Sequence, residues 1–354
     1  MNHSLPLATS VTAPAGGHGG PDALGVPQHD FSTNSNACGP CPQAVAALQA
    51  CDPGHYPDPT YTALRAQLAD FHGVAASRLL LAGSASEFIF RVTAWTAQQG
   101  GQAVQVPAHA YGDYAQAARA WGLPVVTAGP AGLQWLADPS SPLGQTLDAD
   151  SLQPPAPVRV LDCAYAPLRL SGHPALDATA RDAVWQMWTP NKALGLTGVR
   201  AAYVIAPLGA QAAVAGLERL CASWPLGAHG VALLQAWVQP AVQDWLAQSL
   251  CTLRTWKTRQ VDLLDSLGWT CLPSESNFFC ARPALARGAD DLGALLAHLR
   301  GQGIKLRDAT SFGLPGLVRV SVQPPPSQDA LAAGVAQYSL HSARPQLPGE
   351  RPCT

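Results

Sequence analysis

The stretch TPNKALGLTGVR, residues 189–200, decides how this chain folds and works. It places an amine, Lys192, in a glycine-bearing loop and a guanidinium, Arg200, just beyond it. Apolar segments at 184–188 and 198–205 flank the loop, and both are typical of short buried strands. Because ligands bind at loops that follow the strands of open α/β sheets, Lys192 is the first candidate for chemistry. A solvated basic loop is the alternative interpretation.

Lysine is rare in this chain and therefore informative. Of the 21 lysines and arginines, only three are lysines: Lys192, Lys257 and Lys305. An amine that must lose its proton and attack a carbonyl cannot be replaced by arginine, whose guanidinium stays protonated. Lys257 lies in a helical pattern between two arginines, which predicts a solvated face. Lys305 precedes a short apolar run and is also expected at the surface.

Composition predicts a globular enzyme with a sizeable core. The chain has 354 residues, of which 47% are hydrophobic and 12% are charged, so a large domain and a smaller one are expected. A net charge of −2 does not predict binding to nucleic acid or to an anionic membrane surface, which need excess positive charge. No apolar run is long enough to span a bilayer. Nine scattered cysteines suit a reducing compartment, with the cytoplasm as the default.

The cysteine pair in Cys38-Gly39-Pro40-Cys41 matches a thioredoxin-type redox tetrapeptide. Such chemistry needs the motif at the end of a buried strand, at the start of a helix. Here a polar, turn-rich segment, residues 30–36, precedes it. The favoured interpretation is a turn before a helix that starts near Pro42, and the redox interpretation is the alternative.

Alternating strand and helix patterns predict a mostly parallel sheet covered by helices. After residue 230 a long helical stretch runs to about 267, with a kink expected at Pro240. Short strands at 277–281 and 318–322 then alternate with helices, which predicts a smaller α+β module. In the first part the expected strands are 78–82, 103–106, 124–126, 158–162, 184–188 and 198–205.

Three further features carry candidate chemistry. Gly83-Ser84-Ala85-Ser86 joins a strand to a helix, where backbone N–H groups and the helix dipole favour a phosphate, although a plain N-cap is equally compatible. Asp162 ends a strand, where a carboxylate can pair with a protonated ring nitrogen. The phenol of Tyr165 follows three residues later. A simple turn at the end of the strand is the alternative interpretation. Arg319 interrupts an apolar strand, which favours an anionic ligand over an internal salt bridge.

Six motifs in order resemble the histidinol-phosphate aminotransferase group of fold-type I, pyridoxal-phosphate (PLP) dependent enzymes. The cobalamin-pathway threonine-phosphate decarboxylases are grouped with it. The resemblance covers residues 31–338. The motifs are Asn34–Pro40 (N-x-N-P-x-G-P), Tyr56–Pro59 (Y-P-D-P), Pro107–Tyr114 (P-x-P-T-Y-x-x-Y), Asp162–Tyr165 (D-E-A-Y), Asn191–Arg200 (S-K-x-x-G-L-x-G-x-R) and Ser311–Arg319.

The resemblance implies an aspartate-aminotransferase-like α/β fold, with a mostly parallel seven-stranded sheet in the large domain and a smaller α+β domain. It places the large PLP-binding domain at 56–245 and the small domain at 31–55 and 246–342. Residues 1–30 are expected to form a loose arm, and 343–354 a disordered tail. A homodimer with shared active sites is also implied.

The resemblance also implies roles for single residues. Lys192 would form the internal aldimine and shuttle the Cα proton, while Asp162 would hold the pyridinium. Arg319 would bind the substrate carboxylate, and Arg307 a second anionic group such as phosphate. Tyr165 would contact the cofactor's 3′-oxygen, and Tyr111 would stack on its ring. The phosphate would be held by Ser84, Ala85, Ser86 and Arg200. Tyr56 would reach the cofactor phosphate in the partner subunit.

The sequence departs from the family pattern around the substrate. Ser141 stands where the family has an asparagine donor to the 3′-oxygen, and Asn191 replaces the serine before the lysine. Cys38 replaces the aromatic residue that gates the substrate, and Ser86 replaces an aspartate. An aminotransferase acting on an amino acid or amino-phosphate is favoured. The alternatives are an L-threonine-O-3-phosphate decarboxylase and a catalytically degenerate PLP-fold protein.

Overall fold

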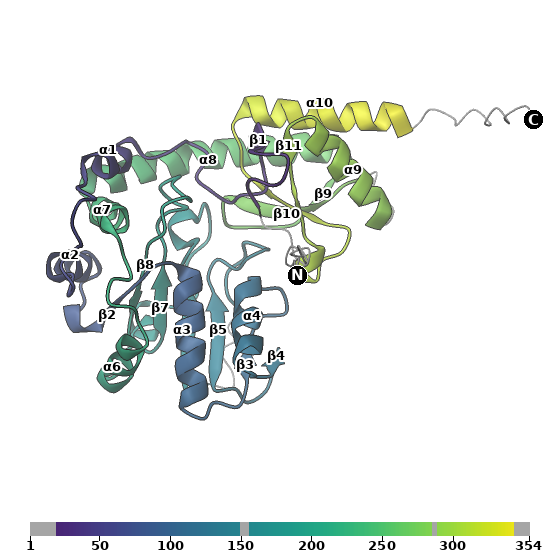
Figure 1. Cartoon of the computed structure of the whole chain (residues 1–354). Coiled ribbons are helices and arrows are strands. Elements are labelled where there is room, and N and C mark those ends of the chain that lie inside the picture. The colour runs from purple at the N-terminus through teal and green to yellow at the C-terminus, as the bar shows by residue number, and fades with distance from the viewer. Residues whose placement is uncertain (1–18, 149–155, 285–288, 343–354) are drawn as a thin grey trace, which may run out of the picture.

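The computed structural model describes residues 19–148, 156–284 and 289–342, which form a large and a small domain joined by one long helix (Figure 1). A seven-stranded sheet forms the centre of the large domain, with strand order β2-β8-β7-β6-β5-β3-β4. Its strands are β2 (Leu79–Ala82), β3 (Val104–Gln105), β4 (Val125–Val126), β5 (Leu133–Ala137), β6 (Val158–Asp162), β7 (Trp185–Trp188) and β8 (Ala202–Ile205).

One strand of this sheet runs against the rest. The pairs β3-β4, β3-β5, β5-β6 and β6-β7 are parallel, whereas β8 is antiparallel to both β7 and β2. Because β2 and β7 are each antiparallel to β8, they run in the same direction, and the carboxyl ends of six strands meet at one edge. The expectation of a mostly parallel seven-stranded sheet is confirmed.

Side-chain alternation explains how the sheet is covered on both faces. In β2, Leu80 and Ala82 belong to a buried cluster with residues of α3, α4 and α6, whereas Leu79 and Leu81 belong to a second cluster with residues of α2 and α7. Successive strand residues point to opposite faces, so an entirely apolar strand needs helices on both sides. The covering helices are α2 (Thr62–His72), α3 (Ala85–Gln98), α4 (Gly112–Ala120), α5 (Ala178–Arg181), α6 (Gln211–Arg219) and α7 (Ala228–Trp237).

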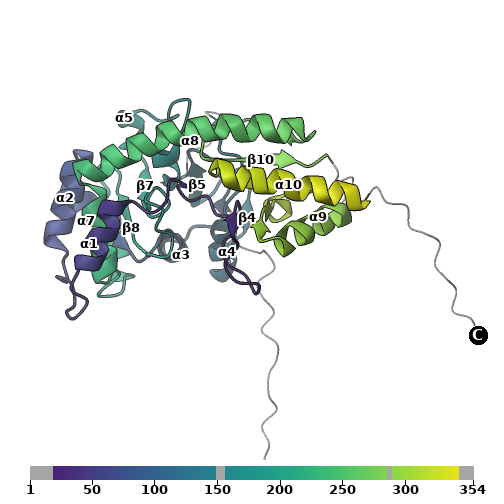
Figure 2. The same cartoon turned by 90° about the horizontal axis from the view of Figure 1, so that it is seen from above.

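The long helix α8 (Pro240–Ser266) runs from the large domain to the small one, beside α10 (Pro325–Ser342) (Figure 2). The kink expected at Pro240 is wrong, because α7 ends at Trp237 and Pro240 opens a new helix. Proline lacks an N–H group but fits the first helical turn, where that group would have no partner. The domain boundary expected at 245/246 therefore falls inside a continuous helix.

The small domain is built on a four-stranded antiparallel sheet of order β12-β13-β10-β9. A separate parallel pair joins β1 to β11. The domain's elements are β1 (His29–Asp30), β9 (Thr270–Cys271), β10 (Phe278–Arg282), α9 (Ala289–Gly301), β11 (Ile304–Lys305), β12 (Arg307–Asp308), the short helix η4 (Thr310–Phe312), β13 (Val318–Ser321) and α10.

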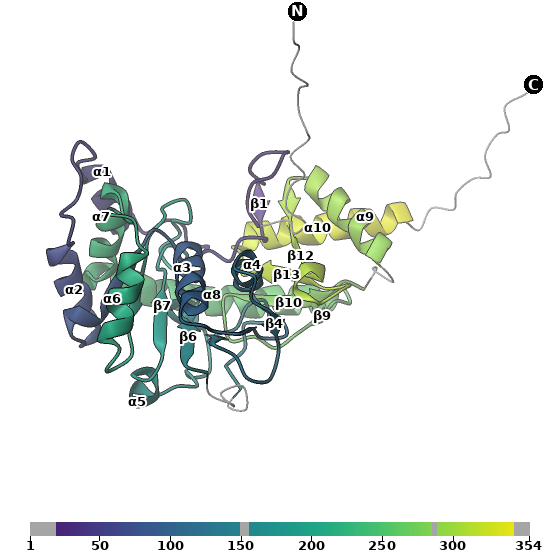
Figure 3. The same cartoon turned by 60° about the horizontal axis from the view of Figure 1, so that its bottom comes forward.

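The N-terminal segment differs from expectation. Residues 19–30 are not a loose arm, because β1 pairs with β11 and Asp22 forms ion pairs with Arg300 and Lys305. Helix α1 (Pro42–Ala50) packs on α7, beside α2, and so lies with the large domain although 31–55 was assigned to the small one (Figure 3). The expectations of a loose arm at 1–18 and of a disordered tail at 343–354 concern residues outside the described ranges. None of the described helices is long and apolar enough to cross a membrane.

Candidate active site

The candidate residues gather where the strands of the large sheet end. The loop after β2 carries Ser84, the loop after β3 carries Tyr111, and β6 ends at Asp162. The loop after β7 carries Lys192. β5 ends just before the 138–144 loop, which holds Ser141, although the sequence analysis did not predict this strand. Its five residues are all buried, and a short run without alternation does not distinguish a strand from a buried helix.

The backbone around Lys192 is held by the N-terminal segment. The N–H of Asn36 donates to the Lys192 carbonyl at 2.9 Å, and the Asn36 amide nitrogen donates to the carbonyl of Ala193 at 3.0 Å. Gly195 has a φ of 69°, and a Cβ there would lie 2.6 Å from the carbonyl oxygen of Gly39. The loop can therefore pack on this segment only with glycine at 195, which leaves the Lys192 backbone tightly positioned.

The three lysines have different surroundings. Lys257 does not lie on a solvated face, since its Nζ donates to the carbonyls of Ser276 at 2.8 Å and Ser274 at 2.5 Å, and burial lowers its pKa to about 8. Lys305 is not free at the surface either, because it pairs with Asp22 at 3.0 Å. Among the described residues the Nζ of Lys192 has no hydrogen bond or ion pair, and it lies 5.1 Å from the centre of the Tyr165 ring. Lys192 is thus the lysine amine left available to react.

Asp162 is a carboxylate held from two sides. Its Oδ1 accepts from the N–H of Ala164 at 2.8 Å, and its Oδ2 accepts from the hydroxyl of Tyr114 at 2.5 Å. Burial raises the pKa of Asp162, while the Tyr114 and Ala164 hydrogen bonds and the charge of Lys192 lower it. The sequence analysis gave Tyr114 no role, although the second tyrosine of Y-x-x-Y lies one helical turn after Tyr111 and so could face the same site.

The phenol of Tyr165 lies beside the amine of Lys192 and is itself positioned by Asn34. The amide nitrogen of Asn34 donates to the Tyr165 hydroxyl oxygen at 3.3 Å, which leaves the Tyr165 O–H free to donate elsewhere. Asn34 is 2% exposed, and its Oδ1 has no hydrogen-bond partner among the described residues. A buried polar atom without a partner is costly, so it indicates a place for a ligand. Only the motif quoted for 34–40 pointed to this residue.

The start of α3 offers a cradle for an anion. Ser84 is its N-cap and accepts from the N–H of Glu87 at 3.1 Å, so the plain N-cap interpretation is true in part. The hydroxyl of Ser86 lies 3.3 Å from that of Tyr111, which links the cradle to the expected ring-stacking residue. Ala85 occupies the first helical turn, where backbone N–H groups and the helix dipole favour a phosphate.

Two arginines face each other on the small-domain sheet. Arg307 of β12 and Arg319 of β13 are register partners, and the ring of Phe312 lies 5.0 Å and 5.3 Å from their guanidinium carbons. Arg319 is 8% exposed and donates to the carbonyl of Ser32 at 3.0 Å, while Arg307 donates to Ser311 at 2.8 Å. Neither makes a salt bridge among the described residues, as expected if Arg319 serves a ligand.

Three further candidate side chains, Ser141, Asn191 and Cys38, make contacts within the chain. The Ser141 hydroxyl is 3.5 Å from a guanidinium nitrogen of Arg319. The Asn191 side chain braces its own loop, since it accepts from Thr189 at 2.9 Å and donates to the Thr197 carbonyl at 3.4 Å. The Sγ of Cys38 points to the carbonyl of Ser249 in α8 at 3.7 Å.

The Cys38–Cys41 pair lies in the turn that leads into α1. Both thiols are free, and Cys41 is buried at the N-cap of α1, where the favoured interpretation placed a turn before a helix. Burial raises the pKa of the Cys38 thiol, which disfavours the reactive thiolate that redox chemistry needs.

Arg200 and Tyr56 are exposed. Tyr56 is 77% exposed, and its ring stacks on Trp224 at 4.5 Å, while the Trp224 indole donates to the Pro57 carbonyl at 3.1 Å. Arg200 lies just before β8, at the sheet edge where the other candidates gather. These two side chains are therefore not enclosed within the chain's own site.

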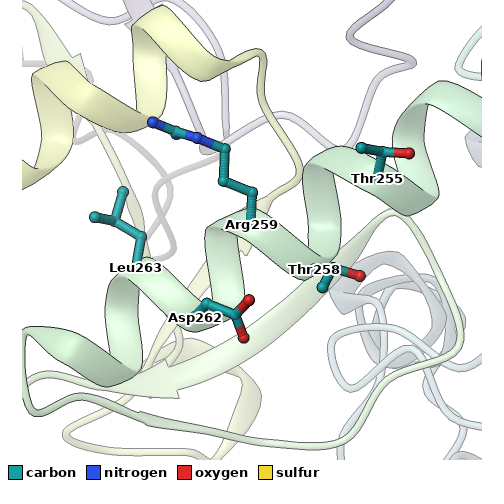
Figure 4. Close-up of a pocket in the computed structure, with 5 residues that line it drawn as sticks. All are labelled: Thr255, Thr258, Arg259, Asp262 and Leu263. Carbon is teal, nitrogen blue, oxygen red and sulfur yellow. The ribbon is translucent and has the colours of Figure 1, made fainter.

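A surface hollow of about 650 Å³ lies over α8, lined by Thr255, Thr258, Arg259, Asp262 and Leu263 (Figure 4). All five residues come from one helix, and Arg259 already pairs with Asp329 at 2.5 Å. No candidate site residue lines it, so this hollow is not the active site.

The residues present fit PLP. Three groups lie at the same sheet edge and suit the three functional parts of the cofactor. The Lys192 amine, which has no hydrogen bond among the described residues, suits the aldehyde. The Asp162 carboxylate at a strand end suits the ring nitrogen, and the N-terminus of α3 suits the phosphate. Oδ1 of Asn34 and Nε of Arg319 are buried polar atoms without a hydrogen-bond partner in the part of the chain that the structure describes, and a bound ligand could satisfy them. When bound, PLP supplies an electron sink for charge that develops at a substrate's Cα. Fold and site together define a PLP-dependent enzyme of fold type I.

The chain belongs to the family of class I and II aminotransferases, whose sequence model matches residues 26–335. It is 30% identical to histidinol-phosphate aminotransferase of Jannaschia sp. (strain CCS1) over 333 residues, 86% of this chain and 89% of the relative. The fold is similar to that of histidinol-phosphate aminotransferase from Sinorhizobium meliloti in complex with pyridoxal-5′-phosphate, with a TM-score of 0.76 at 21% identity over 95% and 99% of the two chains. L-Threonine-O-3-phosphate decarboxylase from Porphyromonas gingivalis gives 0.71 at 20% identity over 88% and 99%.

These findings confirm the predicted family, fold and cofactor and make the chain a PLP-dependent transaminase.

Proposed function

We propose that this enzyme transfers the amino group of an amino-phosphate substrate, histidinol phosphate in the first instance, to 2-oxoglutarate. The Arg307–Arg319 pair carries the proposal. Like charges directly opposite each other on neighbouring strands are unfavourable, and a buried guanidinium without an acidic partner is costly. A dianion lying between the two guanidiniums would remove both costs, since arginine binds phosphate and carboxylate through paired N–H donors.

The same pair suits both halves of a transamination. Histidinol phosphate would present its phosphate to the arginines. The oxo acid would present two carboxylates, one to buried Arg319 and one to half-buried Arg307. The Ser141 hydroxyl, 3.5 Å from Arg319, lies close enough to assist either anion. A pair of guanidiniums on one sheet thus supports recognition of two substrates that share only negative charge.

Each site residue has a distinct task in this proposal. Lys192 holds the cofactor and moves the proton from the substrate's Cα through its Nζ. Asp162 keeps the ring nitrogen protonated, because a carboxylate beside it favours the charged form. Tyr165 donates its O–H to the ring oxygen, while Asn34 holds the phenol from the other side. Ser84, Ala85 and Ser86 hold the phosphate, and Tyr111 covers the ring.

Paired assays on the purified, PLP-saturated enzyme test the reaction. We expect glutamate to form from 2-oxoglutarate when histidinol phosphate is the amino donor. Carbon dioxide release from threonine phosphate without an oxo acid would instead identify the decarboxylase, the class named for the Porphyromonas gingivalis structure. Absence of both products would reject histidinol phosphate and threonine phosphate as substrates, and other amino donors would then be compared with the same oxo acid.

We further propose a homodimer whose active sites are shared. The support is the exposure of Tyr56, held by its stack on Trp224, because an aromatic ring fixed in solvent is suited to a second surface. Its hydroxyl would reach the cofactor phosphate of the partner subunit. Eight described cysteines are free, which agrees with a cytoplasmic location.

Mixed dimers test the sharing of sites. Lys192→Ala removes the amine that holds the cofactor, and Tyr56→Phe removes the hydroxyl proposed to reach the partner's cofactor phosphate. Homodimers of either variant should therefore have little activity. If Tyr56 acts in the other subunit's site, a mixed dimer has one site with both defects and one intact site, and activity should return to at most half of wild type. Mixed dimers no more active than the better parent would contradict sharing through Tyr56.

A further inference from the structure

Asp162 and Tyr114 form a contact that the expected set of site residues does not include. The Tyr114 hydroxyl donates to Oδ2 of Asp162 at 2.5 Å, while the N–H of Ala164 donates to Oδ1 at 2.8 Å. Both carboxylate oxygens therefore have a fixed donor within the chain. Each oxygen can accept a second hydrogen bond, so the carboxylate remains able to receive the N–H of a protonated ring.

Tyr114 is itself held rigidly. It is 2% exposed, and its ring stacks on Trp135 of β5 at 4.3 Å with an interplanar angle of 5°. Tyr111, the N-cap residue of α4, packs on it edge to face at 5.8 Å. The stacking fixes the position of the hydroxyl, because a tyrosine ring has only two side-chain torsions to immobilise. The first turn of α4 thus brings the expected ring-stacking residue and the donor to Asp162 into one aromatic cluster.

The chemistry of this pair favours the charged form of Asp162. Burial raises the pKa of the Tyr114 hydroxyl well above its ordinary value, and the Asp162 carboxylate raises it further. Tyr114 therefore stays a donor across the physiological range. A hydrogen bond donated to the carboxylate stabilises the ionised state and opposes the effect of burial.

We propose that Tyr114 is a positioning residue that keeps Asp162 ionised and aimed at the cofactor's ring nitrogen. Tyr114 acts through Asp162, so it contacts neither substrate nor reacting atoms. The inference rests on the proposed role of Asp162 but not on the proposed substrate. It is therefore tested with the cofactor alone.

Tyr114→Phe removes the hydroxyl and keeps the ring on Trp135. We expect the dissociation constant for PLP to rise about tenfold, the size expected from losing a hydrogen bond to a charged group. The visible absorption band of the lysine-bound cofactor should also shift, because the ring nitrogen would be less firmly protonated. Both quantities are measured without an amino substrate, so failure of the proposed substrate would leave them unchanged.

Tyr203→Phe is the matched control. Tyr203 is equally buried, and its hydroxyl accepts from Trp237 at 3.0 Å and lies 2.8 Å from His72, with no contact to Asp162. We expect this variant to lower the melting temperature without changing PLP affinity or the absorption band. If Tyr114→Phe behaves in the same way, Tyr114 has a merely structural role and the proposal is overturned.

A double variant tests whether Tyr114 acts through Asp162. In Asp162→Asn the carboxylate that Tyr114 serves is absent, so adding Tyr114→Phe should weaken PLP binding little further. If the dissociation constant for PLP instead rises in the double variant by the product of the two single effects, Tyr114 acts independently of Asp162. That result would also overturn the proposal.

Discussion

The Nδ1 atom of His109 donates to the backbone carbonyl oxygen of Phe312 at 2.7 Å, a contact that joins the large domain to the small one. His109 lies two residues before Tyr111, and the Phe312 ring packs against the guanidiniums of Arg307 and Arg319. The hydrogen bond therefore links the loop that is expected to cover the cofactor with the pair that is expected to bind the substrate's anion. Sequence analysis gave His109 no role.

Replacing His109 by alanine should weaken substrate binding more than turnover. Losing this hydrogen bond costs about 1 kcal/mol, which corresponds to roughly a fivefold rise in KM for the amino donor. We expect kcat to fall by less, since His109 contacts no reacting group. Steady-state kinetics measure both constants, with His229→Ala at the exposed start of α7 as control. An unchanged KM would show that the loop holds its place without this bond.

The two arginines should differ in selectivity. Arg307→Gln should lower kcat/KM for a phosphorylated donor by about 30-fold, as expected for losing a charge-assisted hydrogen bond. An unphosphorylated analogue should be affected much less. Arg319→Gln should impair every substrate, because it also leaves the Ser32 carbonyl without its donor. Arg282→Gln, an exposed change on β10 of the same sheet, is the control. Equal losses on both donors for Arg307→Gln would argue against a phosphate contact.

Lys192→Ala should abolish covalent attachment of the cofactor. We expect borohydride reduction followed by mass spectrometry to find PLP bonded to wild type but not to the variant. The transfer rate should fall by about a thousandfold, the order that a general acid–base residue contributes. Lys305→Gln should keep the adduct, because Lys305 is engaged with Asp22 outside the site. An adduct retained in Lys192→Ala would show that another amine reacts.

Asp162→Asn should stabilise the cofactor-free protein at neutral pH. Burial raises the pKa of Asp162 above the ordinary carboxyl value, so the folded state binds this proton more tightly than the unfolded state does. The cost of the ionised form is present above the folded pKa and vanishes below the unfolded pKa of about 4. The gain in urea midpoint should therefore grow from pH 4.5 to 7.5.

Exposed Asp244→Asn is the control for this titration and should show no such trend. A lower midpoint for Asp162→Asn at pH 7.5 would mean that the hydrogen bonds to the carboxylate outweigh its burial. The prediction would then be wrong for the cofactor-free state.

Local sequence was enough to place the candidate cofactor residues on the fold. Lys192, Asp162 and Tyr165 were predicted because each follows a short apolar strand, and parallel strands bring such ends to one edge. These signals are short in range, since strand patterns and turns are set by neighbouring residues. That Gly195 lies against the backbone of Gly39 was seen only in the structure.

The tertiary structure alone decided which side chains meet. Asn36 holds the Lys192 loop from 156 residues away along the chain, and Tyr114 reaches Asp162 across 48 residues. Lys257 has the pattern of a solvated helix face yet is partly buried against the 274–276 loop. No local pattern encodes such contacts, because hydrogen bonds and burial depend on which distant elements pack together. The sequence therefore determined the candidate amine, the candidate carboxylate and the sheet that presents them, while packing decided how each is held.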